Sequence, residues 1–99
     1  MGSAGFSDLR RLLRASDPLT RRLAVASAFN AVDPRAAFLL EDGLRDPDAG
    51  VRRIAAAQIM DIRPVFTKKT RAFRRLAEKR LVSETNEDVR VVLRRAIHP

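Results

Sequence analysis

The sequence predicts an all-α fold in which six helices pair into three stacked hairpins. Signals for β-strands are nearly missing, since the chain has no alternating Val/Ile/Thr runs and no Asn-Gly turn. Asp-Pro dipeptides stand at positions 17–18, 33–34 and 46–47. Each marks a helix boundary, because proline disfavours a helical conformation in the residue before it. Between these boundaries, apolar residues recur at helical spacing.

The first hairpin is expected over residues 6–32. Ser7 can cap its first helix, which has an apolar face of Leu9, Leu12 and Leu13. Asp17 and Pro18 then provide the N-cap and the first residue of a second helix, which extends to about Ala31. Its apolar face is predicted from the helical spacing of Leu19, Leu23 and Ala26.

The second hairpin is expected over residues 33–62. Asp33-Pro34 opens its first helix, which turns Ala37, Leu40 and Leu44 inward. Asp46 is the expected N-cap of the next helix, because Pro47 follows it. That helix carries one apolar stripe, formed by Val51, Ile54, Ala55, Ile59 and Ile62.

The third hairpin is expected over residues 63–98. Pro64 precedes a helix from about Val65 to Val82, whose inward residues are Phe66, Phe73, Leu76 and Ala77. Thr85 followed by Asp88 resembles a capping box and opens the last helix, with a stripe of Val89, Val92, Leu93, Ala96 and Ile97. Connections of about 2 to 4 residues force neighbouring helices to be antiparallel, and the length suits a single domain over 1–99.

A short motif recurs in each hairpin. Arg21-Arg22-Leu23-Ala24 returns as Arg52-Arg53-Ile54-Ala55 after 31 residues, and Val51-Arg52 returns as Val89-Arg90 after 38. The middle copy is the fullest and consists of Leu39, Leu40, Asp46, Pro47, Val51, Arg52, Ala55, Ala56 and Ala57. The first copy has Thr20 in place of the valine, and the third has Asn86-Glu87-Asp88 in place of Asp-Pro.

This pattern resembles the HEAT-like repeat family, in particular the short repeats also found in phycobilin lyases. The resemblance covers nearly the whole chain and implies a right-handed α-α superhelix (solenoid) of three HEAT-like hairpins. A compact bundle of three or four helices is the alternative. The alanine-rich second helices disfavour it, because a free bundle usually uses larger core residues.

The resemblance also implies a structural role for three arginines. In such repeats the arginine after the valine usually bridges to the aspartate of the next repeat. Arg21, Arg52 and Arg90 are therefore expected to form an internal ladder, with Asp17 and Asp48 as their partners.

The composition narrows the functional classes. The chain has 99 residues and no cysteine, which excludes disulfides and thiolate metal sites and is compatible with a reducing cytoplasm. It has no run of 18 apolar residues and no uncharged signal-peptide core, so a cytoplasmic protein without a membrane span is expected. The net charge is +8 and unevenly spread, with +7 in residues 63–99 and −2 in residues 33–62.

Residues for catalysis are scarce. The only histidine is His98, and the chain has no Ser-His pair, phosphate-binding loop or nucleotide fingerprint. We therefore expect no enzyme activity, no cofactor and no metal site. Glu41 and Asp42 lie near a helix C-terminus, where the helix dipole disfavours anions, and form a candidate acidic contact patch for a basic partner.

The fifth helix is the main candidate for binding. Residues 63–80 hold eight basic residues and one acidic residue, Glu78. At 100° per residue, Lys68, Arg71, Arg75 and Lys79 fall within about 80° of each other. Arg74 borders them, and Arg94 and Arg95 of the last helix can extend the group. We call these seven residues the basic strip. A solvated surface is the alternative, although such surfaces usually intersperse acidic residues.

Three functions remain open from the sequence. The first is a non-catalytic adaptor or scaffold that docks an acidic protein surface through the basic strip and the repeat groove. The second is sequence-nonspecific binding to the backbone of DNA or RNA. The third, which follows from the resemblance alone, is a chaperone-like helper of an enzyme or cofactor-lyase system. The exposed terminal helix also allows self-association, whereas membrane binding is not expected.

Overall fold

The computed structural model describes residues 6–28, 36–62 and 70–98, and within these ranges all regular secondary structure is α-helical. Six helices follow one another without a strand in the described part: α1 (Phe6–Leu12), α2 (Pro18–Ala28), α3 (Ala36–Leu44), α4 (Ala49–Ile62), α5 (Thr70–Ser83) and α6 (Glu87–Ile97). The prediction of an all-α fold is therefore confirmed for these residues. None of these helices is both long and apolar enough to cross a membrane.

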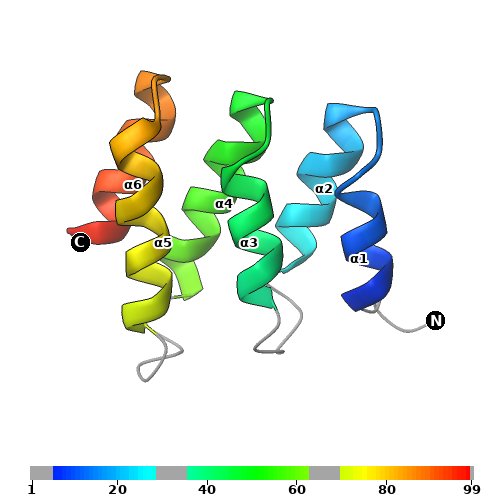
Figure 1. Ribbon diagram of the computed structural model, residues 1–99, viewed down its shortest axis with the longest axis horizontal. Helices are drawn as coiled ribbons and strands as arrows, with labels where there is room; N and C mark the ends of the chain where they lie inside the picture. The colour runs from blue at the N-terminus through cyan, green and yellow to red at the C-terminus, as the bar shows by residue number, and fades with distance from the viewer. Residues whose placement is uncertain (1–5, 29–35, 63–69, 99) are drawn as a thin grey trace.

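The helices are arranged as three neighbouring pairs. In Figure 1, α1 with α2, α3 with α4, and α5 with α6 lie side by side in the order of the chain. The second helices of the three pairs form the more closely packed row, the inner row, in which α4 lies between α2 and α6 and contacts both. The first helices form a looser row, in which α3 contacts both α1 and α5. Among the described residues, the helix pairs at both ends of the array consequently contact another pair on one side only.

The core lies between the two rows and is continuous through the three pairs. Its largest fully buried side chains are Val25, Leu39, Leu40, Val51, Ile59, Val89 and Leu93. Ala55 and Ala56 of α4 are both completely buried. Because their side chains are small, α4 can approach its neighbours closely. The alanine-rich helix that the sequence singled out is therefore the central packing element of the described structure.

The buried face of α2 differs from the predicted one. Leu19 and Leu23 are 61 % and 70 % exposed, whereas Ala24 and Val25 are buried. Helical periodicity identifies two faces of this helix but does not say which one packs. The face with the small Ala24 and Val25 packs because α4 approaches α2 closely, and the leucines remain exposed.

Two predicted caps are displaced by a few residues. α4 begins at Ala49, so its N-cap is Asp48, whose carboxylate accepts a hydrogen bond from Val51 N at 3.0 Å. α6 is capped by Asn86 rather than Thr85, since the Asn86 side chain accepts from Val89 N. The expected cap Asp17 does accept from Leu19 N at 3.1 Å. Asp33-Pro34 and Phe66 lie outside the described residues.

Candidate functional site

The basic strip is only partly within the described structure. Lys68 lies outside it, and Arg71 belongs to α5 but its side chain is not described. Arg74, Arg75 and Lys79 are all exposed on α5, as the helical angles predict. Arg74 forms an ion pair with Glu78 at 3.2 Å. Arg75 and Lys79 form no ion pair with any residue that the structure describes.

The two arginines of α6 are exposed but not equivalent to those of α5. Arg94 Nη1 donates to Glu87 Oε1 at 3.0 Å, so its charge is largely compensated within its own helix. Arg95 is also exposed on α6. The strongest uncompensated positive charge in the described part of the strip therefore comes from Arg75 and Lys79.

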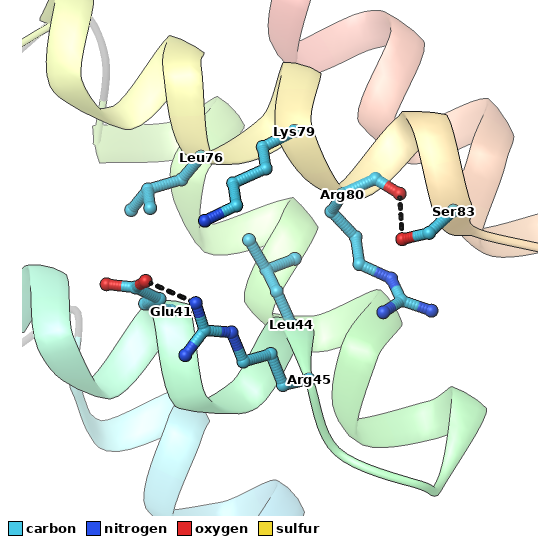
Figure 2. A pocket seen from close by; sticks show the side chains of 7 residues that line it. All are labelled: Glu41, Leu44, Arg45, Leu76, Lys79, Arg80 and Ser83. Atoms are coloured by element: carbon cyan, nitrogen blue, oxygen red, sulfur yellow. Dashed lines mark hydrogen bonds and ion pairs between the residues drawn. The ribbon is translucent and has the colours of Figure 1, made fainter.

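Lys79 borders a groove between α3 and α5. Figure 2 shows Lys79 extending from α5 toward α3, with Leu44 and Leu76 beside it. Glu41 and Arg45 line the α3 side of the groove, and Arg80 and Ser83 line the α5 side. The space holds about 80 Å³, which is too small for a drug-sized or cofactor-sized ligand. This groove has room for a single side chain rather than for a whole small molecule.

The candidate acidic patch is reduced by an ion pair. Glu41 is half-buried and accepts from Arg45 Nη2 at 2.9 Å, one helical turn along the chain (Figure 2). Asp42 is exposed, and its side chain makes no hydrogen bond with a described residue. Among the described residues, Asp42 is thus the unpaired carboxylate of the two, and a role for Glu41 and Asp42 as a contact patch stays a prediction.

Two arginines connect consecutive pairs of helices, but their partners are not the predicted ones. Arg21 donates from Nε and Nη2 to Asp46, at 2.8 and 3.2 Å. Arg52 donates in the same way to Glu84, at 2.7 and 3.0 Å. The predicted pairing of these arginines with Asp17 and Asp48 is wrong, because Asp46 and Glu84 occupy the Nε–Nη2 edges of Arg21 and Arg52. The bonding carboxylates lie two residues before each cap position.

The remaining nitrogen of each arginine fastens the turn before its own helix. Nη1 of Arg52 donates to the carbonyls of Asp46 and Pro47, at 2.9 and 3.0 Å. Nη1 of Arg21 does the same with Ala15 and Ser16, and Nη1 of Arg90 donates to Leu81 and Glu84. Each arginine therefore orders the turn within its own pair, and Arg21 and Arg52 also hold the next pair through bidentate, charge-assisted bonds.

Glu84 is the most completely enclosed charge in the described residues. Its side chain is fully buried and accepts from Arg52, from Arg80 Nε at 3.0 Å and from Asn86 N at 2.9 Å. Burial alone would disfavour the ionised carboxylate. The hydrogen bonds from Arg52, Asn86 N and Arg80 outweigh it and lower the pKa of Glu84 to about 2. Glu84 is thus ionised at neutral pH and joins α4, α5 and α6.

Sequence reasoning did not identify Glu84. A usable signal was the 38-residue repeat that relates Val51 to Val89, since the same shift relates Asp46 to Glu84. Both carboxylates also accept from a backbone N–H two residues later, Asp48 N at 2.8 Å and Asn86 N at 2.9 Å. The change from aspartate to glutamate concealed the equivalence.

A second link between pairs was also missed. Arg22 donates from Nε and Nη2 to Asp48, at 2.9 and 3.3 Å. These hydrogen bonds lower the pKa of Asp48 below its ordinary value, while partial burial opposes the shift. They likewise raise the pKa of Arg22. Asp48 is therefore both the cap of α4 and a contact to α2.

Gly50 leaves the space in which this second link forms. A Cβ atom at position 50 would overlap the guanidinium group of Arg22. Gly50→Ala is expected to displace Arg22 and to raise the pKa of Asp48 toward its ordinary value, because the Arg22 hydrogen bond is the main cause of the lowered pKa. NMR titration of the Asp48 carboxyl measures this change, and Arg22→Gln should produce the same rise. An unchanged Asp48 titration in both variants would contradict the assignment.

The described residues offer little for metal chemistry, since no three of their His, Asp or Glu side chains are grouped so that they could hold an ion. Comparison of the chain with family models, with curated proteins and with solved structures finds no match. The features of the described residues that bear on function are the exposed charges of α5, the grooves beside it and the ion pairs between the helix pairs.

Proposed function

We propose that the chain is a non-catalytic adaptor that binds an acidic protein surface through the basic strip and the adjoining α3–α5 groove. The observation that carries this proposal is the pair Arg75 and Lys79. Both are exposed, lie one helical turn apart and face no described carboxylate within ion-pair distance. Like charges at this spacing are mutually repulsive, so a partner carboxylate would gain from both.

The arrangement of the helix pairs supports the same function. We propose that the pairs are HEAT-like repeats of a right-handed superhelix, in which bonds such as Arg21–Asp46 and Arg52–Glu84 fix one pair against the next. A rigid array presents its side chains in a fixed pattern, which lowers the conformational entropy lost on binding. This suits an interaction surface more than a site that must close around a substrate.

Charge reversal of the two cations tests the proposal. Arg75→Glu combined with Lys79→Glu is expected to abolish capture of acidic proteins from an extract of the native host, as measured by quantitative mass spectrometry. Arg14→Glu combined with Arg53→Glu is the matched control, because it changes the net charge equally at two other exposed arginines. Circular dichroism checks that both variants remain helical. Equal capture by the two double variants would show that only net charge matters.

Nucleic acid is distinguished by a separate measurement. Fluorescence anisotropy with duplex DNA over a salt series should give weak binding at about 0.15 M salt, because backbone contacts alone seldom bind tightly there. Stacking contacts have no support, since the chain lacks Trp and Tyr and Phe73 is buried. Tight, salt-sensitive binding that depends on Arg75 and Lys79 would replace the adaptor proposal with nucleic-acid binding.

A further inference from the structure

Arg90 occupies the same position as Arg21 and Arg52 but lacks their carboxylate. Its Nη1 donates to the carbonyls of Leu81 and Glu84, at 3.0 and 2.9 Å, so the guanidinium group is held in place. The Nε–Nη2 edge makes no hydrogen bond to a described residue, and Glu87 approaches Nε only to 3.8 Å. The side chain of Arg90 is 30 % exposed, compared with 13 % for Arg21 and 11 % for Arg52.

The helix beside Arg90 repeats the surface that α3 offers to α5. In the turn after α3 the N–H of Asp46 bonds to Gly43 O, and in the turn after α5 the N–H of Glu84 bonds to Arg80 O. Gly43 and Arg80 therefore hold equivalent positions, so a residue of α5 corresponds to the residue 37 positions earlier in α3. The α3 wall of the α3–α5 groove consists of Glu41, Leu44 and Arg45. Their counterparts Glu78, Leu81 and Val82 line another groove, at the free side of α5.

This second groove is open and larger than the first. Its volume is about 470 Å³, and Arg90 and Ile97 of α6 also line it. Val82 is one of the most exposed large apolar residues in the described part. This side of the last helix pair thus combines a groove that is lined partly by apolar side chains with a fixed guanidinium edge. In the preceding pair, the corresponding features are covered by α5 and by Glu84.

We propose that this end surface binds a single α-helix of another protein, with an Asp or Glu just after its C-terminal end. The helix lies against α5 as α5 lies against α3, and its carboxylate bonds to Nε and Nη2 of Arg90 as Glu84 bonds to Arg52. Bidentate geometry and a partly desolvated arginine make such a contact specific for a carboxylate. The site is separate from the Arg75 and Lys79 pair of the proposed function.

A complete further helix pair fits less well than one helix. Ala56 of α4 is completely buried where the helices of the inner row pack. The 38-residue shift places Arg94 of α6 at the corresponding position, where it is exposed and paired with Glu87. A long cation there prevents another inner helix from packing as closely as α6 packs on α4, so the partner covers mainly the α5 side.

A second copy of the chain lacks the required carboxylate. Asp46 and Glu84 lie six residues before Arg52 and Arg90, and Ala15 lies six residues before Arg21. A copy that stacked head to tail would bring Ala15 and the exposed Arg14 toward Arg90 and Arg74. This offers no hydrogen-bond acceptor from a side chain and places like charges together. The occupant is therefore a helix of a different protein that carries this carboxylate.

A peptide copied from this chain tests the site. The probe is a fluorescent peptide of residues 70–86, which contains Glu84, with Lys and Glu joined as a lactam at positions 74 and 78 to keep it helical, because this pair lies away from the face that packs on α3. The intact chain is the receptor, and its own Glu84 already occupies Arg52. We expect the peptide to bind and its Glu84→Gln version to bind at least about tenfold more weakly. Equal affinities, or no binding of either peptide, would refute the proposal.

Receptor variants locate the contact. Arg90→Lys should remove the preference for the Glu84 peptide, and Val82→Lys should weaken both peptides without affecting the fold, because Val82 is exposed. Arg94→Lys is the control and should bind like the wild type. The Arg75→Glu, Lys79→Glu receptor should also bind normally, which separates this site from the proposed function. Dimers in sedimentation velocity that Val82→Lys dissolves would instead identify a second copy as the occupant.

Discussion

Replacing Glu84 with alanine is expected to lower the free energy of unfolding by about 3–5 kcal/mol, the usual cost of breaking a buried ion pair from one side. The variant leaves the partly buried guanidinium groups of Arg52 and Arg80 without their acceptor, and the N–H of Asn86 loses its bond as well. Urea unfolding followed by circular dichroism at pH 7 measures the difference. The free energy of unfolding of a small protein is about 5–15 kcal/mol, so this loss would be a large fraction of the total stability.

Glu78→Ala provides the matched control for this result. Glu78 also forms an ion pair with an arginine one turn away on α5, but both partners of that pair are about half exposed. Such pairs contribute little, about 0.5 kcal/mol or less. If Glu84→Ala costs no more than Glu78→Ala, the buried carboxylate does not join α4 to the last helix pair. Glu84→Gln keeps the shape of the side chain and serves if the alanine variant does not fold.

The lowered pKa of Glu84 predicts where this contribution disappears. Its pKa is about 2 in the folded chain against an ordinary 4.5, so the folded state favours the ionised form. The stabilisation is complete above pH 4.5, where the Glu84 carboxyl is ionised in folded and unfolded chains alike. It is lost as the pH falls through about 2, because the carboxyl is then protonated in both states. The difference in unfolding free energy between wild type and Glu84→Gln should therefore shrink over this range.

Local signals in the sequence predicted the helices well. Asp17-Pro18 begins α2 as expected, and the stripe of α6 is buried at Val89, Leu93, Ala96 and Ile97. These features depend on neighbours within a turn or two, which a sequence pattern contains directly. The exposure of Arg75 and Lys79 followed in the same way from helical angles. Whether they bind a partner stays a prediction.

Contacts between helix pairs were predicted less well. The partner of Arg52 is 32 residues away, and the choice between Asp48 and Glu84 depends on how far α5 extends before the turn. Likewise, the exposed Leu19 and buried Ala24 of α2 exchange their expected roles because α4 approaches so closely. Distances between helices decide these outcomes, and hydrophobic periodicity carries no information about such distances.

The close approach of α3 to α2 and α4 can be tested at Gly43, a buried residue that no sequence pattern identifies. A Cβ atom at this position would lie 3.0 Å from Ala55 Cβ and 3.1 Å from Val25 Cγ2. Gly43→Val should lower the free energy of unfolding by about 3 kcal/mol, because two further methyl groups overpack a contact that is already tight. Urea unfolding of the variant measures this loss.

The control for Gly43→Val is Ala72→Val, which adds a valine at an exposed position of α5. Its cost should stay within the helix propensity of valine, about 0.7 kcal/mol or less. Adding Ala55→Gly to Gly43→Val removes the nearest obstructing Cβ and should recover part of the lost stability, whereas Ala55→Gly alone destabilises by emptying a packed position. If the two changes are merely additive, α3 is not held against α4 through this contact, and the spacing of the helix pairs has another cause.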